Sequence, residues 1–185
     1  LPFGTGIAAT VVPFTGLKAG PIAKGRDIFR ELGVRTFINA AGTYTAMTGS
    51  LMQDEVVEAI RNASKEFCLL DELQDKVGEK IATLVHAESA VVTAGCFSAM
   101  TLGLAGVLTG KDQQKVEQLP HLDGTGMKSE VIMQKAHTIG YSHALTNTGC
   151  TIVYVESIAD VEKAINSKTA LLWFLNVQSD AGAIS

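Results

Sequence analysis

The sequence is poor in charge, in basic residues and in long apolar runs, and each shortage excludes a class of function. Charged residues make up 18% of the 185 residues, against roughly 25% in an average globular domain. The 15 Lys and Arg are outnumbered by 19 Asp and Glu, so the net charge is −4 and nothing predicts binding to nucleic acid or to an anionic membrane. No run approaches the roughly 20 apolar residues of a membrane-spanning helix. Because a chain with so little charge tends to hide its surface, we expect a helix-covered sheet and a homo-oligomer, a dimer or larger.

The sequence also lacks the spacings that mark disulfide frameworks and metal sites. The three cysteines are far apart and form no C-x-x-C pair, and the four histidines show no H-x-x-x-H spacing. The cysteines are Cys68, Cys96 and Cys150, and the histidines are His86, His121, His137 and His143. Scattered thiols of this kind predict free cysteines, and we expect no bound metal.

The first 24 residues differ in composition from the rest of the chain. Residues 1–20 contain a single charge, several small residues and an apolar centre. These features fit the trimmed remainder of an export signal, and they fit equally an extended arm that packs on a partner subunit. We therefore expect 1–24 to be an arm or a signal remnant, and ordinary folded sequence to begin at residue 25.

Apolar periodicity predicts helices and strands that alternate along the chain. Helices are expected over 54–67, from about 71 with Asp71 and Gln74 as a capping box, and over 98–109, 139–147 and 157–166 with Ser157 as N-cap. Strands are expected over 89–93, 131–133, 151–155 and 170–174, and a loop over 111–127. Strands that are apolar on both faces and alternate with helices predict an α/β fold, an αβα sandwich with a mostly parallel sheet. Four strands are fewer than such sheets usually carry, so we expect part of a larger domain.

A glycine turn between the strand at 89–93 and the next helix is the first candidate site. Its sequence is VVTAGCFSA, with Gly95 directly before the helix. Glycine lets a ligand approach the backbone, and the free amides and dipole of a helix start suit a phosphate. An ordinary strand-to-helix turn explains the same residues equally well. The turn lacks the G-x-G-x-x-G pattern of dinucleotide-binding domains, and Glu156, which ends a later strand, is too far away to be their acidic residue.

Two further segments carry polar residues in positions that could form a site. The strand at 131–133 delivers Lys135 and His137 to the carboxyl end of the sheet, where open α/β sheets hold their ligands. The imidazole of His137 could stack on a flat aromatic cofactor, or it could hydrogen-bond its own loop. The stretch NAAGTYTAMTGS, which begins at Asn39, has the glycines and hydroxyls of a loop that lines a cleft.

Taken in order, these segments resemble one family of pyridoxal-phosphate enzymes. The resemblance begins with FINAAGT at 37–43 and continues through SLMQDEVVEAI, ELQDKVGEKIA, ESAVVTAGCFSAMTL, LPHLDGTGMKSEVIMQKAH and TALLWFLN. It is to the selenocysteine synthase (L-seryl-tRNA selenium transferase) family, which includes lyases of the D-glucosaminate-6-phosphate ammonia-lyase type, and it covers most of residues 25–178, the N-terminal part of such enzymes.

The resemblance implies a fold, a cofactor and a set of contacts. The fold would be part of the large domain of the aspartate-aminotransferase-like (fold type I) enzymes, with 25–70 as an N-terminal segment bordering the active site and 71–185 as an incomplete cofactor-binding domain. Pyridoxal 5'-phosphate would be held by its phosphate at Gly95, Cys96 and Phe97. His137 would lie over the pyridine ring, and Ser179 would belong to a polar loop beside the cofactor. The substrate pocket would be bordered by Asn39, Gly42 and Thr43.

The resemblance also implies an activity, which this chain would not perform alone. The family's chemistry predicts a lyase or transferase acting on an amino acid or amino sugar, a small-molecule amine, by β-elimination. None of the eleven lysines matches the family's Schiff-base lysine, which is expected downstream together with the aspartate for the ring nitrogen, so no catalytic residue is assigned here. With four arginines and an acidic balance, tRNA is not an expected partner.

Two other functions and two locations stay open at the level of sequence. The chain could be a non-catalytic α/β assembly domain that lacks the Schiff-base lysine, or a nucleotide-binding α/β domain. The resemblance favours the cytoplasm, whereas residues 1–20, if they are a signal remnant, would indicate export.

Overall fold

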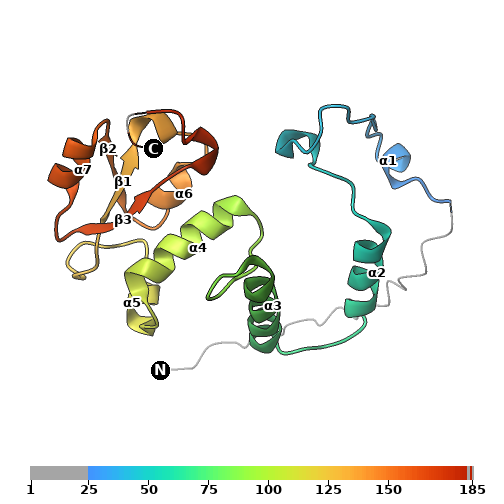
Figure 1. The fold of residues 1–185 in the computed structure, drawn as a ribbon. Coiled ribbons are helices and arrows are strands. Elements are labelled where there is room, and N and C mark those ends of the chain that lie inside the picture. The colour runs from blue at the N-terminus through green and yellow to red at the C-terminus, as the bar shows by residue number, and fades with distance from the viewer. Residues whose placement is uncertain (1–24, 183, 185) are drawn as a thin grey trace, which may run out of the picture. The chain divides into compact units, whose positions relative to one another are not determined.

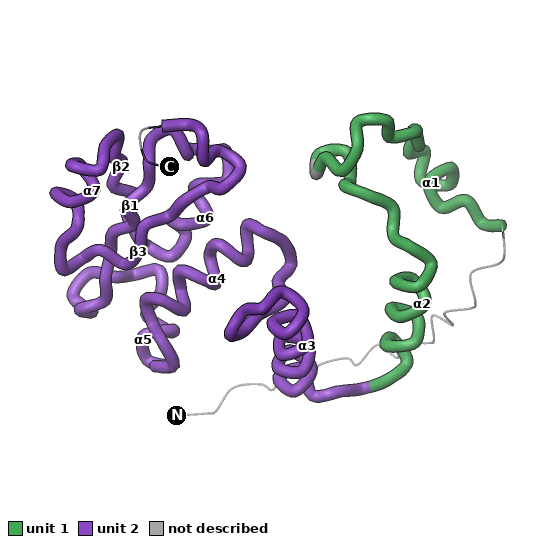
Figure 2. Tube along the Cα trace, in the orientation of Figure 1, with its two compact units in different colours: residues 1–66 green, residues 67–185 purple. Residues whose placement is uncertain are grey.

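A computed structural model describes residues 25–182 and 184, which form two units. The first comprises Leu1–Glu66 and the second Phe67–Ser185, coloured separately in Figure 2. The expected arm over 1–24 lies outside the described residues. No helix in the described part of the chain is both long and apolar enough to cross a membrane.

The first unit contains short helices joined by loops. Helix α1 is Ile28–Glu31, the 3-10 helix η1 is Thr45–Met47, and α2 is Asp54–Ala63. The expected helix over 54–67 is therefore confirmed but ends four residues early. The hydroxyl of Ser64 donates to the carbonyl of Arg61 at 2.9 Å, a local bond that competes with helix continuation. The apolar stripe of α2 is exposed within this unit, because none of its residues is buried.

The second unit contains a parallel three-stranded sheet, visible in Figure 1 with helices on its flanks. The strands are β1 (Glu130–Gln134), β2 (Thr151–Val155) and β3 (Thr169–Trp173), in the order β2-β1-β3. β1 pairs in parallel with both neighbours. Three of the four expected strands are thus confirmed, and so is the α/β fold with a parallel sheet.

The core of this unit lies between the sheet and two helices, α4 (Cys96–Thr109) and α6 (His143–Thr146). Leu104 and Leu108 of α4 and Leu145 of α6 pack in one buried cluster with Val131 and Met133 of β1. The side chain of Ile132, on the other face of β1, is also fully buried. β1 is therefore apolar on both faces because it is the central strand, as its sequence predicted.

Helix α7 (Ile158–Ala164) confirms its expected start. The side chain of Ser157 accepts a hydrogen bond from the amide of Asp160, which satisfies one of the free donors of the first turn. Helix α7 follows β2 and packs against it. Glu156, which directly follows β2, lies at the carboxyl edge of the sheet.

The expected strand at 89–93 is absent, which corrects that prediction. Val91 is 64% exposed, and the carbonyl of Val92 accepts from the side chain of Gln74 at 2.7 Å rather than from another strand. A strand needs a partner, and none of the three described strands pairs with this segment. The capping box at Asp71 and Gln74 is also wrong, since helix α3 (Leu70–Val85) begins before Asp71 and has Leu69 as its N-cap without a side-chain bond.

Two connections also differ from the sequence-based expectation. The loop over 111–127 contains helix α5 (Gln113–Gln118), whose N-cap Asp112 accepts from the amides of Gln114 and Lys115. The helix expected over 139–147 shrinks to the single turn of α6, which follows the 3-10 helix η2 (Lys135–His137) and a series of turns. In both places the structure follows short-range capping and turn bonds that apolar periodicity does not report.

Candidate functional site

The turn before α4 leaves its backbone amides open. Gly95 is the N-cap residue, with a φ of 134° that side chains rarely allow, and no atom lies within 4 Å of the position its Cβ would take. The carbonyl of Gly95 accepts from the amide of Ala99 at 3.0 Å and from the hydroxyl of Thr93 at 2.9 Å. Within the described residues, the amides of Cys96, Phe97 and Ser98 have no hydrogen-bond acceptor. Free amides and a positive helix end together attract an anion.

The same turn is anchored from its other side by α6. The ring of Phe97 meets the ring of His143 with centroids 4.8 Å apart. The hydroxyl of Thr101, one turn into α4, donates to the carbonyl of Ala144 at 2.9 Å. Cys96 is exposed at the first position of the helix. Of the three residues predicted to hold a phosphate, Cys96 and Phe97 have amides without an acceptor among the described residues, and Gly95 leaves the approach to them open. Phe97 is also held by its contact with α6.

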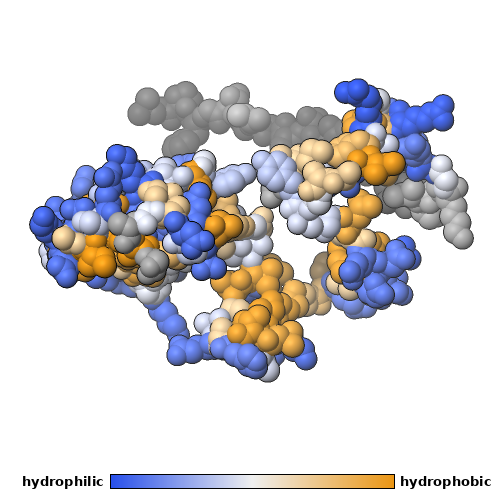
Figure 3. Space-filling view, turned by 45° about the horizontal axis from the view of Figure 1, so that its top comes forward, coloured by the Kyte–Doolittle hydropathy of each residue, from blue (hydrophilic) through white to orange (hydrophobic). Residues whose placement is uncertain are grey.

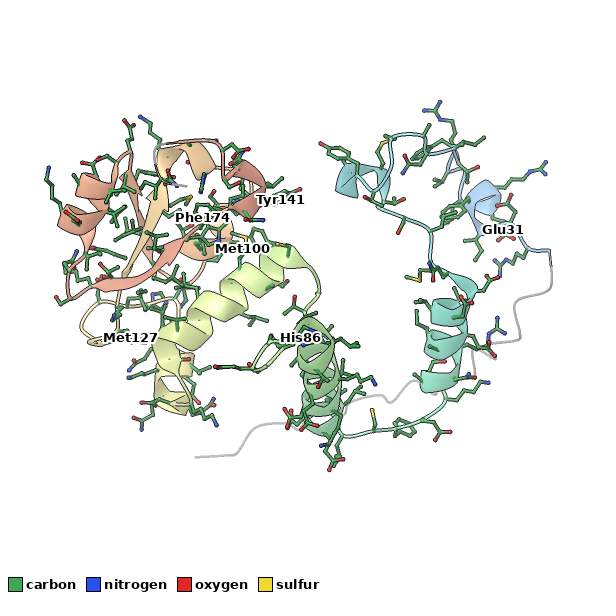
Figure 4. The ribbon with its side chains drawn as sticks, in the orientation of Figure 1. Glu31, His86, Met100, Met127, Tyr141 and Phe174 are labelled. Atoms are coloured by element: carbon green, nitrogen blue, oxygen red, sulfur yellow. The ribbon has the colours of Figure 1, made fainter. Side chains whose placement is uncertain are left out.

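His137 lies in the interior, just beyond the end of β1. Its side chain is 0% exposed. Nδ1 accepts from the amide of Leu175 at 3.2 Å, and Nε2 lies 3.2 Å from the carbonyl of Ala181. A carbonyl only accepts and an amide N–H only donates, so these partners require a neutral ring with its proton on Nε2. The ring of Phe174, labelled in Figure 4, meets that of His137 edge-on at 4.6 Å.

These contacts decide between the two interpretations of His137 only in part. The histidine bonds the segment after β3, and not its own loop. Stacking on a cofactor ring stays a prediction. What the structure does bring together is His137 and the segment of Ser179, the other residue predicted beside the cofactor.

Ser179 directly follows the 3-10 helix η3 (Asn176–Gln178), and its amide donates to the carbonyl of Asn176 at 3.1 Å. It is half-buried and lies between Leu175 and Ala181, the two residues that His137 holds. The neighbouring side-chain oxygen Oε1 of Gln178 is buried and has no hydrogen-bond partner among the described residues. The segment after β3 thus carries polar groups to the carboxyl end of the sheet.

The loop of Asn39 belongs to the first unit and is closed by that side chain. Oδ1 of Asn39 accepts from the amide of Ala41 at 2.9 Å, and Nδ2 donates to the carbonyls of Gly42 and Gly49 at 2.9 and 3.3 Å. Gly42 has a φ of 83°, which the turn requires. Thr43 is exposed. Asn39 therefore shapes the loop, and the place of Asn39, Gly42 and Thr43 beside a substrate pocket stays a prediction.

A groove at the carboxyl ends of β1 and β2 was not predicted from the sequence. It has a volume of about 740 Å³ and is lined by Lys135, Thr138, Tyr154, Glu156 and Asp160. Lys135 and Glu156 form an exposed ion pair of 2.9 Å, and the hydrogen bond and charge of Glu156 raise the pKa of Lys135. The available signal was that both residues directly follow parallel strands.

The ion pair between Lys135 and Glu156 argues against Lys135 as the lysine that binds a cofactor covalently. The amine of Lys135 is held by a carboxylate, which favours the protonated form, and a protonated amine is not a nucleophile. The carboxyl group of Asp160 accepts from the hydroxyl of Ser157 at 2.7 Å, which lowers the pKa of Asp160. Among residues 25–182 and 184, no three His, Cys, Asp or Glu side chains are grouped to hold a metal ion.

Comparison with known proteins identifies relatives that are longer than this chain. No family model matches it. The chain is 31% identical over 158 residues to D-glucosaminate-6-phosphate ammonia lyase of Salmonella typhimurium, a match that covers 80% of this chain and 42% of that protein. It is 24% identical over 163 residues to 5'-C-glycyluridine monooxygenase-decarboxylase of a Streptomyces species, covering 83% of this chain and 40% of that protein.

A solved structure gives the same result. The structure of D-glucosaminate-6-phosphate ammonia-lyase matches with a TM-score of 0.72 at 31% identity, over 80% of this chain and 42% of that one. The chain spans about two fifths of the length of the curated relatives it matches. It is therefore a homologue of an ammonia-lyase in both sequence and fold, and this homology supports a place in that enzyme's family.

Proposed function

We propose that the chain is the phosphate-holding part of a pyridoxal-phosphate-dependent lyase that acts on an amino sugar or amino acid by elimination. The observation that carries the proposal is the first turn of α4, where three consecutive amides are free within the described residues and Gly95 leaves the approach open. The similarity to an ammonia-lyase over 158 residues supports the reaction class.

The residues of this turn fit the phosphate of the proposed cofactor. A helix start presents roughly half a positive charge to a bound anion, and the amides of Cys96, Phe97 and Ser98 would donate to the phosphate oxygens. A side chain at position 95 would stand in the space before those amides. Since no basic side chain is needed for this mode of binding, the low basic content of the chain is no obstacle.

The remaining residues of the chain would position and shield the cofactor. When bound, pyridoxal phosphate withdraws electrons from the carbon next to the substrate's amine. His137 would present a neutral ring, because its nitrogens are engaged by Leu175 and Ala181. Ser179 would reach the cofactor from the segment that His137 holds. In this proposal the covalent lysine is none of the eleven in this chain, because none matches the Schiff-base lysine of the family that the sequence resembles. Lys135, at the carboxyl end of β1, is paired with Glu156.

The names of the two relatives agree more closely on the class of substrate than on the reaction. Their names describe a glucosaminate phosphate and a glycyluridine, both of which carry an amine on a sugar-derived skeleton. The activities differ, one an ammonia-lyase and the other a monooxygenase-decarboxylase. We favour the lyase because identity is higher there and a structure agrees.

The proposed assembly follows from the apolar surface of the chain, and the proposed location follows from the substrate. Large apolar side chains are exposed over much of the described chain, as Figure 3 shows. Such surface is typical of subunit or domain contacts, so we propose a homo-oligomer, and a cytoplasmic one in keeping with a small phosphorylated or polar amine substrate.

The decisive experiment measures binding of pyridoxal phosphate and of pyridoxal, its dephosphorylated form, to the chain and two variants. Gly95→Ala should weaken pyridoxal-phosphate binding at least tenfold, on the order of one or more lost charge-assisted hydrogen bonds. Gly110→Ala is the matched control, because Gly110 ends the same helix with a positive φ and open space. Equal affinity of the wild type for both compounds would remove the basis of the proposal.

A second experiment tests the assignment of the lysine. Reduction of the complex with borohydride, followed by peptide mapping, should label no single lysine of this chain preferentially. Lys76 is the reference for Lys135, because it too is exposed and paired with a glutamate, Glu79, at 2.9 Å. Specific labelling of Lys135 would contradict its assignment as a paired, protonated amine.

A further inference from the structure

Two polar side chains at the end of β1 are buried. Gln134 is 2% exposed and His137 is 0% exposed. Burying polar groups is unfavourable unless they are hydrogen-bonded. The main chain of β1 already pairs with β2 and β3, so these side chains must be satisfied elsewhere.

Gln134 uses both ends of its carboxamide on one residue of the C-terminal segment. Nε2 donates to the carbonyl of Ile184 at 2.6 Å, and Oε1 accepts from the amide of Ile184 at 3.2 Å. This is the pair of bonds that a neighbouring strand would make with the backbone of Ile184. A side chain therefore replaces a strand at this point of the sheet.

His137 holds the same segment at two earlier points. Its ring nitrogens bond the amide of Leu175 and the carbonyl of Ala181, both at 3.2 Å. Together the two side chains contact Leu175, Ala181 and Ile184. The helix η3 and Ser179 lie between the first two of these points and are held on both sides.

Gly182 shows how closely the segment approaches the strand end. A Cβ at this position would lie 2.5 Å from Oε1 of Gln134 and 3.2 Å from Cβ of Ala136. Its φ of 103° is a conformation that other residues rarely adopt. Only glycine allows the segment to lie against Gln134 in this way.

We propose that Gln134 and His137 form a clamp that positions residues 175–182 and 184, and with them Ser179, at the carboxyl edge of the sheet. Both are positioning residues, since they act through the segment they hold. The consequence for cofactor binding rests on the proposed function, while the clamp itself rests on the four hydrogen bonds and on Gly182. The clamp links residues up to 50 positions apart through side-chain bonds to the main chain of the segment.

The first test removes the carboxamide at constant size. Gln134→Met should raise amide hydrogen exchange across residues 175–182 and 184 roughly tenfold, as expected for the loss of one or two hydrogen bonds, and leave exchange in β2 unchanged. Gln118→Met, the same substitution at an exposed position of α5, is the control. Unchanged exchange in residues 175–182 and 184, or an equal rise in β2, would overturn the clamp.

A second variant keeps the carboxamide and displaces the segment instead. Gly182→Ala should produce the same local rise in exchange through contact with Gln134. Gly124→Ala is its control, because Gly124 has a positive φ of 74° and no atom lies within 4 Å of the position its Cβ would take, so it shares the strain and lacks the contact. Equal effects of the two substitutions would show that backbone strain, and not the clamp, is responsible.

The functional readout separates the clamp from the phosphate turn. Gln134→Met should weaken pyridoxal-phosphate binding severalfold and leave the affinity for inorganic phosphate unchanged, because phosphate alone would contact only the start of α4. Unchanged pyridoxal-phosphate affinity with a loosened segment would overturn the positioning role. If the wild type binds inorganic phosphate but no pyridoxal phosphate, the proposed function fails, and the exchange results still decide whether the clamp exists.

Discussion

The start of α4 and the end of β1 lie in the same unit and treat their polar groups in opposite ways. At the start of α4, the amides of Cys96, Phe97 and Ser98 have no acceptor among the described residues. At the end of β1, both ends of Gln134 and both nitrogens of His137 are hydrogen-bonded. The start of α4 is therefore suited to bind a ligand, whereas the polar groups at the end of β1 hold part of the protein's own fold.

This difference separates binding from positioning within one candidate site. Open donors cost little while solvent reaches them, because water satisfies them until a ligand arrives. Closed polar groups in the interior stabilise one arrangement and penalise others, because breaking them leaves buried groups unpaired. We therefore expect substitutions at the end of β1 to affect stability and to change binding only indirectly, through the segment they hold, and those at the start of α4 to affect binding directly.

The largest expected effect is on stability, at His137. His137→Phe removes both acceptor and donor and leaves the amide of Leu175 and the carbonyl of Ala181 unpaired, at a cost of about 2–4 kcal/mol. Urea unfolding measures this as a lower midpoint. His121→Phe is the control, because His121 is exposed and its substitution should cost less than about 0.5 kcal/mol. Equal losses of stability in the two variants would contradict the expected difference between the buried, hydrogen-bonded His137 and an exposed histidine.

A smaller effect is expected in the reactivity of the cysteines. Cys96 is exposed at the open turn, whereas Cys150 is buried and desolvation raises the pKa of its thiol. Because the thiolate is the reactive form, Cys150 should react with a maleimide on the order of a hundredfold more slowly than Cys96 at pH 8. Mass spectrometry of the labelled chain measures the two rates.

The same labelling experiment tests the open turn directly. Added pyridoxal phosphate should slow labelling of Cys96, because Cys96 is the first residue of α4 and belongs to the proposed phosphate site. It should not slow labelling of Cys68, the other exposed thiol. Equal protection of both thiols would indicate that the ligand acts through aggregation or a general change in the fold.

The sequence predicted the elements whose signal is local. β1, β2 and β3 are continuous apolar runs, α4 follows a glycine, and α7 begins at a serine cap, and each was expected within a few residues of its observed bounds. The turn at Gly95 was predicted for the same reason. Glycine, the helix start and the small residues that follow are adjacent in the chain, so the geometry can be inferred from neighbouring residues.

The parts that sequence reasoning missed depend on distant partners. The segment 89–93 has the composition of a strand, but whether it pairs depends on the rest of the sheet. The carbonyl of Val92 accepts from the side chain of Gln74 instead of from a neighbouring strand. Gln134 ends an apolar strand and would ordinarily be taken for a surface residue. Its burial depends on Ile184, 50 residues later, which periodicity cannot report.

The smallest expected effect concerns α7, whose capped start contrasts with the uncapped start of α4. Ser157→Ala removes the hydroxyl that caps α7 and should lower stability by about 1 kcal/mol at neutral pH. The same hydroxyl lowers the pKa of Asp160 below its usual value of 3.8. A lowered carboxyl pKa stabilises the fold above the unfolded value, and that contribution is lost as the pH falls below it. The difference in stability between wild type and Ser157→Ala, measured by thermal unfolding, should therefore shrink from pH 5 to pH 3.

An equivalent change at the start of α4, Thr93→Ala, should show no such pH dependence, because no carboxyl group shares its hydrogen bond to Gly95. A difference between wild type and Ser157→Ala that stays constant with pH would show that the cap acts on the helix amide alone.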